Sequence, residues 1–517
     1  MRIRFEKLGS VGLNTDIAPT LLPPEVWTSL YNVSTEDGSI RSAFGERKLF
    51  DTIKPKYHFS FVDNSVQKLI ISDGTAVRAY TMDGGHTNIT PTPGLSSDVV
   101  SFTTLNGLLV VNTELSGPYY WAGGASVLLT LPGWGATWRC KQLIGFHNAL
   151  IALNMTESGT NYPHKLRWSN SADPGALPTT WTPAPENDAG DAIIGDTAGF
   201  IMSGALLRDM LVIVKEDALY SMRYIGGNFV FQLERMSGGI GTRVLKGVAI
   251  SNTTLAIFTV SDLLLFDGQN TTSIVEAKIR RGITASVSEE SWQESELFAF
   301  PIGSQLVLGL VAAGRTRMNS ALIFNTDDGT WSHRAVHNGY GFGQIRVDQQ
   351  NPLTWDAIAS VGWISGDTWD SQIGAGWNKG VYNPSTDDAI VYQSNDANDS
   401  WWVSLITAFD GSSDGTAKSC QATRTGIPIG GADKLVMVTR VWPEFLANIP
   451  TQVWVGGQMT SDGEVSWVGP FTSTPGQTFS VTPRLTCRFL SVRIESNGIG
   501  RWRLPAITVD YEPAGER

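Results

Sequence analysis

The sequence predicts an all-β fold, and three observations lead to that expectation: a recurring hairpin unit, a scarcity of helix-forming residues and a second region of long alternating strands. The 517 residues include 54 Gly, 24 Pro and 18 Trp, and only 17% are charged. Few positions then remain for the Lys, Glu and Ala that cover solvent-facing helices. We therefore expect a degenerate β-propeller with an additional C-terminal β-sandwich domain and an extended N-terminal arm.

The recurring unit is a short apolar strand, a polar turn and a second strand that ends in glycine, as antiparallel neighbours require. Successive units begin 39, 42, 61, 44 and 51 residues apart, at Lys68, Gly107, Ala149, Met210, Thr254 and Gln305. Propeller blades are four-stranded sheets that repeat at about 40–50 residues, whereas the repeats of a β-helix are much shorter. The spacing therefore favours a propeller of five to seven blades over residues 53–395.

Two segments lie outside this repeat. Residues 1–52 begin with an alternating strand, and Pro23 and Pro24 then precede a predicted short helix with Val26 and Leu30 on one face. Such an arm needs another domain or another subunit to pack against. Residues 396–517 contain long alternating runs that predict a β-sandwich of six to eight strands, serving as a platform or attachment domain.

Two shorter stretches are ambiguous between helix and strand. Residues 286–298 form the best helix candidate in the chain. Residues 297–314 are apolar enough to suggest a membrane helix, but Pro301 and Gly303 interrupt them, which favours two strands joined by a turn. We expect the chain to insert no segment of its own into a membrane.

An acidic, tryptophan-bearing stretch at 341–400 ends the predicted propeller. It holds eight acidic and two basic residues, a net charge of −6 out of −11 for the whole chain. We expect a surface that faces a partner or a lumen; the alternatives are packing of solvated loops and glycan binding by the indole faces. The candidate lumen or gate residues are Trp355, Asp356, Trp363, Asp367, Trp369, Asp370, Trp377 and Asp387.

Five arginines alternate with apolar residues near the C-terminus, which places several of them on one strand face. A phosphate-binding strip is one interpretation, but residues 400–517 contain ten basic and ten acidic residues. That balance favours cross-strand or inter-subunit pairing. The candidate residues for a subunit or partner interface are Arg484, Arg488, Arg493, Arg501 and Arg503.

The sequence carries no motif for a nucleophile elbow, a zinc protease, a phosphate loop or a dinucleotide-binding turn. His333 and His337 have the spacing of a metal pair on a helix, but the surrounding alternation predicts a strand. The segment TDDGTW at 326–331 resembles the Asp-box turn of sialidase propellers with one residue missing, which points to a structural turn. We expect no enzymatic activity, no cofactor and no metal.

The three cysteines and the net charge bear on compartment and partners. Cys140, Cys420 and Cys487 are widely spaced and fit neither a disulfide framework nor a metal motif, so we expect buried thiols in a reducing cytoplasm. A net charge of −11 argues against a broad basic face that grips nucleic acid.

Three passages follow one another in an order that resembles the tail hub proteins of short-tailed, podovirus-type phages. They are GLNTDIAP…LYNVSTEDGSIRSAFGERKLF, then GFIMSGALLRDMLVIVKEDALYSMRYIGG…GIGTRVLKGVAI, and finally RFLSVRIESNGIGRWRLPAITVDYE. Members of this group are called tail nozzle, tail tubular B or packaged-DNA stabilisation proteins. The likeness spans most of the chain through pattern and order, without a short signature from which single residues could be transferred.

The resemblance implies a structural virion protein made in the host cytoplasm: a homohexameric ring at the distal end of the tail. Its partners would be the tail adaptor ring and the tail fibres or tail needle (plug). Packaged double-stranded DNA would pass through the lumen without sequence-specific binding. An acidic lumen suits this task, because the duplex carries one negative charge per about 1.7 Å of axis. The alternative is a tail-associated glycan-binding receptor protein or depolymerase with a propeller fold, which we expect to be trimeric.

Overall fold

In the computed structural model, the described residues form an all-β chain, as predicted. Their helical elements are α1 (Arg280–Ser286) and the 3-10 turn η1 (Pro19–Leu21). The description covers residues 1–517 except 65, 96–97, 228, 252, 260–261, 287–294, 301–303, 346–387, 396–397, 399, 408–411, 432, 478 and 517.

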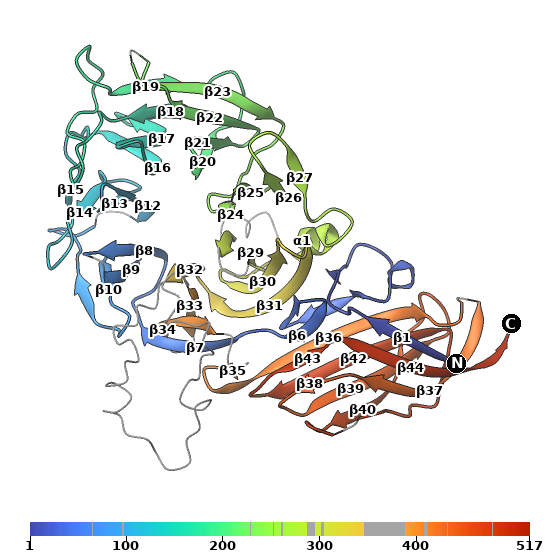
Figure 1. The fold of residues 1–517 in the computed structure, drawn as a ribbon. Helices are drawn as coiled ribbons and strands as arrows, with labels where there is room; N and C mark the ends of the chain where they lie inside the picture. The colour runs from blue at the N-terminus through green and yellow to red at the C-terminus, as the bar shows by residue number, and fades with distance from the viewer. Residues whose placement is uncertain are drawn as a thin grey trace.

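Seven four-stranded antiparallel arrangements of the described strands form a closed ring (Figure 1). The first strand of each one contacts the first strand of the next, and β32 contacts β8, which closes the circle. The first four are β8 (Tyr57–Asp63), β9 (Val66–Ser72), β10 (Val77–Tyr80) and β11 (His86–Asn88); β12 (Val99–Leu105), β13 (Leu108–Thr113), β14 (Tyr119–Trp121) and β15 (Leu129–Thr130); β16 (Trp138–Phe146), β17 (Ala149–Glu157), β18 (Thr160–Trp168) and β19 (Gly190–Ile193); β20 (Ile201–Leu207), β21 (Met210–Lys215), β22 (Ala218–Tyr224) and β23 (Phe231–Gly238). The last three are β24 (Val248–Ser251), β25 (Thr254–Phe258), β26 (Leu263–Phe266) and β27 (Thr271–Ser273); β28 (Glu296–Phe300), β29 (Gln305–Leu310), β30 (Met318–Asn325) and β31 (Thr330–Gly339); β32 (Gly341–Ile345), β33 (Asp388–Asn395), β34 (Ser400–Thr407) and β7 (Gly45–Asp51).

Local sequence explains the hairpins of the ring. Asn106 and Gly107 both have positive φ, at 50° and 82°, and they join β12 to β13 in a two-residue turn with Leu105 paired to Leu108. Asn-Gly suits such a turn because both central residues must adopt the left-handed region. The second strand of a sheet is buried on both sides where neighbouring sheets cover it, and every residue of β21 is buried. Such strands are therefore continuous apolar runs.

The ring is completed by strands from outside the predicted range 53–395. β7 comes from the N-terminal segment and pairs with β34, which lies beyond residue 395. β31 continues through β5 (Val33–Glu36), β6 (Ser39–Ser42), β43 (Trp502–Leu504) and β38 (Leu446–Ala447). A strand pattern in the sequence shows which residues are extended but not which distant strand they pair with. These pairings therefore could not be predicted from the sequence pattern.

Both ends of the chain build the domain beside the ring, here called the terminal domain (Figure 1). One sheet has the order β1–β44–β37–β41. Beside it, β4 pairs with β36, and β36 is followed in the sheet by β42, β39 and β40. Residues from both groups of strands contribute to one buried apolar cluster. The remaining bounds are β1 (Arg2–Glu6), β2 (Gly12–Leu13), β3 (Val26–Trp27), β4 (Ser29–Tyr31), β35 (Ser412–Ser413), β36 (Thr416–Pro428), β37 (Lys434–Pro443), β39 (Thr451–Gln458), β40 (Ser466–Ser473), β41 (Leu485–Cys487), β42 (Phe489–Gly498) and β44 (Ala506–Glu516).

The N-terminal arm therefore packs on the same chain. β1 pairs with β44, and the Arg2 guanidinium donates to both oxygens of Asp510 at 2.6 and 2.9 Å. The predicted helix after Pro24 is wrong: this segment forms β3 and β4 because Trp27 and Leu30 are buried against other elements. The Trp27 Nε1–H donates to the carbonyl of Leu8, and β4 pairs with β36.

The second predicted helix, at 286–298, lies mostly outside the described residues, and its last three residues form a strand instead. The helix α1 ends at Ser286, where the predicted helix begins, and residues 296–298 belong to β28. Residues 287–294 lie outside the described part. β28 pairs with β29 from Glu296↔Gly309 to Phe300↔Gln305, so the expected pair of strands within 297–314 is confirmed.

A buried carboxylate joins the ring to the terminal domain. Glu46 on β7 accepts from the Arg334 guanidinium on β31 at 2.6 Å and from the Gln393 amide on β33 at 2.8 Å. The ammonium of Lys418 on β36 lies 3.5 Å away. Burial alone would raise the pKa of Glu46, but the two cations and these hydrogen bonds outweigh burial and lower it to about 2. Burial and the charge of Arg334 lower the pKa of Lys418 to about 8.

We predict that Glu46→Ala lowers the free energy of unfolding by about 3–5 kcal/mol, because it leaves Arg334 and Lys418 buried without their counter-charge. Chemical denaturation at pH 7 measures this loss. Glu114→Ala, an exposed site, serves as the control and should change stability by no more than about 0.5 kcal/mol. A loss below about 1 kcal/mol for Glu46→Ala would contradict the role of this network.

Candidate functional site

A cavity of about 540 Å³ lies where the first strands of the ring sheets meet. Residues of β8, β12, β16, β20, β24, β28 and β32 all line it. Its walls combine apolar side chains such as Phe59, Phe102 and Ile250 with the titratable residues His58, Lys246 and Glu296. Concave sites with a few convergent polar groups are where ligands bind most often, so this axial cavity is one candidate site.

The titratable groups of the axial cavity form a fixed cluster. The Nε2 of His58 lies 3.1 Å from the carbonyl oxygen of Phe342 and 3.8 Å from the Glu296 carboxylate. Burial would raise the pKa of Glu296, but Lys246 and His58 outweigh it and lower the pKa. Burial, helped by the charge of Glu296, raises the pKa of Tyr392, whose ring lies 4.0 Å from the His58 ring. Glu296 is thus held ionised and can anchor a hydrogen-bond donor.

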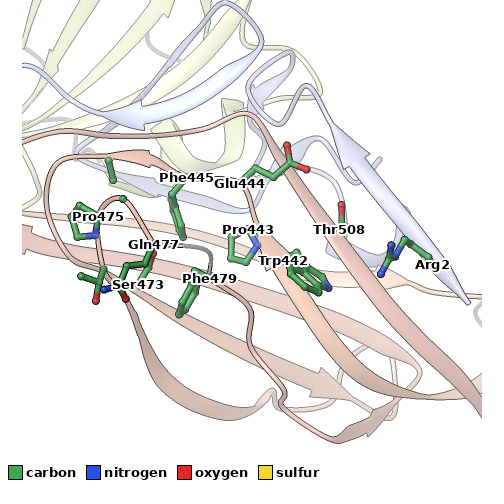
Figure 2. A pocket seen from close by; sticks show the side chains of 13 residues that line it. Arg2, Trp442, Pro443, Glu444, Phe445, Ser473, Pro475, Gln477, Phe479 and Thr508 are labelled. Atoms are coloured by element: carbon green, nitrogen blue, oxygen red, sulfur yellow. The ribbon is translucent and has the colours of Figure 1, made fainter.

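A second concavity of about 460 Å³, here called the terminal cleft, lies on the terminal domain (Figure 2). It opens between the segment 442–447 and the loop around 473–479. Trp442, Phe445 and Phe479 provide half-buried aromatic surface. Figure 2 shows Arg2, Thr508 and Trp442 at one end and Ser473 and Pro475 at the other. None of these residues is among the candidates predicted from the sequence, although Trp442 and Pro443 at the end of an alternating strand were a usable signal.

The predicted lumen or gate residues remain a prediction. Trp355, Asp356, Trp363, Asp367, Trp369, Asp370, Trp377 and Asp387 all lie outside the described residues.

The five C-terminal arginines are not brought onto one strand face. Arg493 lies within β42, and its guanidinium is 4.3 Å from the Trp467 ring and 3.6 Å from the Glu495 carboxylate. Arg503 lies on β43, 3.7 Å from Asp37. The exposed Arg484 and half-buried Arg488 flank the short strand β41, and Arg501 precedes β43. Strand ends and turns separate the five arginines, because the alternating run that contains them is divided among the shorter strands β41, β42 and β43.

Arg501 and Arg503 nevertheless share surroundings with Arg41 of the arm. Burial lowers the pKa of Arg41, the Glu36 carboxylate opposes that shift, and the charges of Arg501 and Arg503 add to the lowering. The Arg41 guanidinium also lies 4.2 Å from the Phe44 ring. The like charges of Arg501 and Arg503 repel Arg41, so the arm is joined to this region by the Arg503–Asp37 ion pair and by the pairing of β43 with β6.

The segment TDDGTW is a structural turn, as predicted. It joins β30 to β31, and the Asn325 side chain accepts from the backbone N–H of Asp327 at 2.9 Å. Trp331 is fully buried, and its Nε1–H donates to the carbonyl of Ile274 at 2.9 Å. The strand predicted around His333 and His337 is also confirmed, since both residues lie on β31.

The three cysteines are free and buried, as expected. Burial raises the pKa of each thiol, to about 11 for Cys487, so none is a thiolate near neutral pH. Within the described residues, no group of three or more His, Cys, Asp or Glu side chains could hold a metal ion. No helix in that part of the chain has the length and apolar character needed to cross a membrane.

Large apolar side chains are exposed at both ends of the strands in two neighbouring sheets. The Phe200 patch contains Tyr162, Ile193 and Phe200, and the ring of Phe200 lies 5.6 Å from that of His164. The Phe229 patch contains Tyr224, Ile225 and Phe229, and the Tyr224 ring stacks on His147 at 4.9 Å. The strand registers place Tyr162 and Ile193 at the opposite end of the sheets from His147 and Tyr224. Exposed apolar patches commonly mark interaction surfaces.

Comparisons with known proteins give no family. No family model matches the chain, and no curated protein matches it. Among solved structures it is similar to the WD40 domain of Neurospora crassa Pan2, with 6% identity, 70% of this chain and 95% of that chain covered, and a TM-score of 0.39.

Two further similarities are equally distant. PorZ, a surface component of the type-IX secretion system of Porphyromonas gingivalis, is 11% identical, with 76% of this chain and 44% of that chain covered and a TM-score of 0.37. The extracellular domain of the candidate one-component system BT4673 from B. thetaiotaomicron is 14% identical, with 56% and 39% covered and a TM-score of 0.32. The chain spans less than half the length of these two proteins. Likeness at this distance says nothing about function.

The half-buried His333 should make the chain sensitive to mild acid. Burial lowers its pKa to about 4, from an ordinary value of 6.5. Between these values the unfolded chain binds a proton that the folded chain does not, so stability falls as the pH drops from 6.5 to 4. One pKa unit corresponds to about 1.4 kcal/mol, and the unfolded histidine is already half protonated at pH 6.5. We predict that between pH 6.5 and pH 5 the wild type loses about 1.5 kcal/mol more of its free energy of unfolding than His333→Gln does.

Urea denaturation at both pH values measures this difference. His337→Gln is the matched control, because His337 is exposed on the same strand, and it should behave like the wild type. An equal loss in wild type and His333→Gln would show that His333 does not titrate in this window.

Proposed function

We propose that this chain is the subunit of a ring-shaped tail nozzle of a short-tailed phage, a conduit and closure for packaged double-stranded DNA. In this proposal the closed ring of sheets is a degenerate β-propeller. The two-sheet terminal domain is a β-sandwich that attaches the subunit to its neighbours. The order of sequence passages is the source of the proposal, and hexameric assembly under a tail adaptor ring follows from that resemblance.

The exposed apolar patches are the observation that favours a ring subunit over a solitary binding protein. A cyclic ring is built from a heterologous interface, in which one surface of a subunit meets a different surface of the next. The Phe200 and Phe229 patches are two such different surfaces on one subunit. Phe200 is 47% exposed and Phe229 is 77% exposed, and burial against a neighbouring copy would remove that apolar area from water.

The paired strands and buried charges at the junction between ring and terminal domain suit the same role. A conduit that resists internal pressure must transmit load between its domains. The strands β31 and β7 continue from the ring toward the terminal domain, and Glu46 ties them to β36 through buried charges. A net charge of −11 is compatible with DNA that slides past the protein without binding it.

We predict that Phe200→Asp and Phe229→Asp each weaken assembly at least tenfold, because a carboxylate would be buried in an apolar interface. Native mass spectrometry of the purified chain, alone and with an adaptor ring, measures the assembled fraction against concentration. Leu129→Asp, at a site 50% exposed on β15, is the matched control and should assemble normally.

The oligomeric state of the purified chain distinguishes the candidate functions. A hexamer, or a chain that assembles sixfold on an adaptor ring, supports the nozzle. A trimer would favour the glycan-binding receptor or depolymerase, and a monomer indifferent to any ring would overturn the proposal.

A further inference from the structure

The terminal cleft contains aromatic surfaces that are held in place by contacts outside the cleft. The Trp442 Nε1–H donates to Asp510 at 3.4 Å, and the Arg440 guanidinium lies 5.1 Å from the centroid of its ring system. The Phe445 ring packs edge to face with Trp502 at 6.5 Å, and Phe479 packs against the same buried cluster. Because these rings are already fixed, a ligand that stacks on them does not have to order them on binding.

The polar groups of the cleft are neutralised in pairs. Arg2 is bound through two hydrogen bonds to Asp510, and the Glu444 carboxylate accepts from Arg4 at 2.9 Å. The cleft therefore offers no unmatched charge from these residues to attract a phosphate or a metal ion. Glu444 keeps spare acceptor capacity, and the Gln477 amide on the exposed loop offers both donors and acceptors.

We infer that the terminal cleft binds a neutral saccharide, with one pyranose face against the aromatic surface and its hydroxyl groups toward Glu444, Gln477 and Thr508. A pyranose has an apolar face of C–H groups and an equatorial rim of hydroxyls. Half-buried aromatic rings beside neutralised polar side chains match both features. A lipid tail would leave this polar lining unsatisfied, and an anionic ligand would find no free cation among the paired groups described above.

This inference goes beyond the proposed function and does not depend on it. The cleft lies on the terminal domain, whereas the Phe200 and Phe229 patches lie on ring sheets. Sugar binding can therefore be tested on the purified chain in any oligomeric state, and Phe200→Asp should leave it unchanged. Failure of the nozzle proposal and failure of the saccharide site are thereby distinguished.

The test is saturation-transfer NMR and calorimetry of the full chain with the methyl glycosides of glucose, galactose, rhamnose and N-acetylglucosamine. We expect at least one glycoside to receive saturation at its ring protons. Phe479→Ala and Gln477→Ala should each weaken its binding about tenfold, the effect of losing one good contact of about 1.4 kcal/mol.

Gln269→Ala, at an exposed turn of a ring sheet, is the matched control and should bind normally. Gln477→Ala is the safer variant, because Gln477 is exposed whereas Phe479 also packs on the core. A proline-rich PxxP decapeptide is included, since aromatic grooves also accept such segments. Binding of the peptide alone, no response to any glycoside, or a response unaltered in both cleft variants would overturn the inference.

Discussion

The buried Glu46 carboxylate holds together segments that are far apart in the chain. It lies on β7, and its partners Arg334, Gln393 and Lys418 come from β31, β33 and β36. Burying these charges is costly unless every partner is in register, so the network stabilises one arrangement of these strands over any shifted one. Ring closure by β7, and the attachment of the terminal domain, both depend on that arrangement.

This dependence explains why the arm belongs to the folded subunit. β1 completes a sheet with β44, β4 pairs with β36, and β5 extends the sheet of β31. Asp16 also accepts from the first backbone N–H groups of α1, at 3.0 and 2.9 Å. The arm thus crosses from the terminal domain to the ring and stabilises both. In the proposed assembly, contacts with other subunits would use surfaces that remain exposed after the arm has packed.

Features set by local chemistry could be predicted from the sequence. The hairpin at Asn106–Gly107, the buried run of β21 and the turn TDDGTW depend on turn conformation and strand burial, which neighbouring residues determine. Features that depend on distant parts of the chain could not be predicted from the sequence. The segment after Pro24 forms strands because Trp27 is buried against other elements of the fold. The terminal cleft brings together Trp442 and Phe479, which lie far apart in the sequence.

The candidate sites differ in what each could contribute. The axial cavity carries an ionised Glu296 fixed beside His58, the terminal cleft offers neutral aromatic surface, and the two apolar patches expose area that a neighbouring copy could cover. Of these features, the proposed ring assembly uses the two patches. The proposed assembly therefore rests on the exposed apolar side chains of the two patches.

The most direct test of the central claim is electron microscopy of the purified chain, alone and bound to a tail adaptor ring. We expect sixfold rings with a central opening, in which the edge carrying Phe200 in one subunit faces the edge carrying Phe229 in the next. Isolated single-chain particles under both conditions, or threefold assemblies, would contradict it.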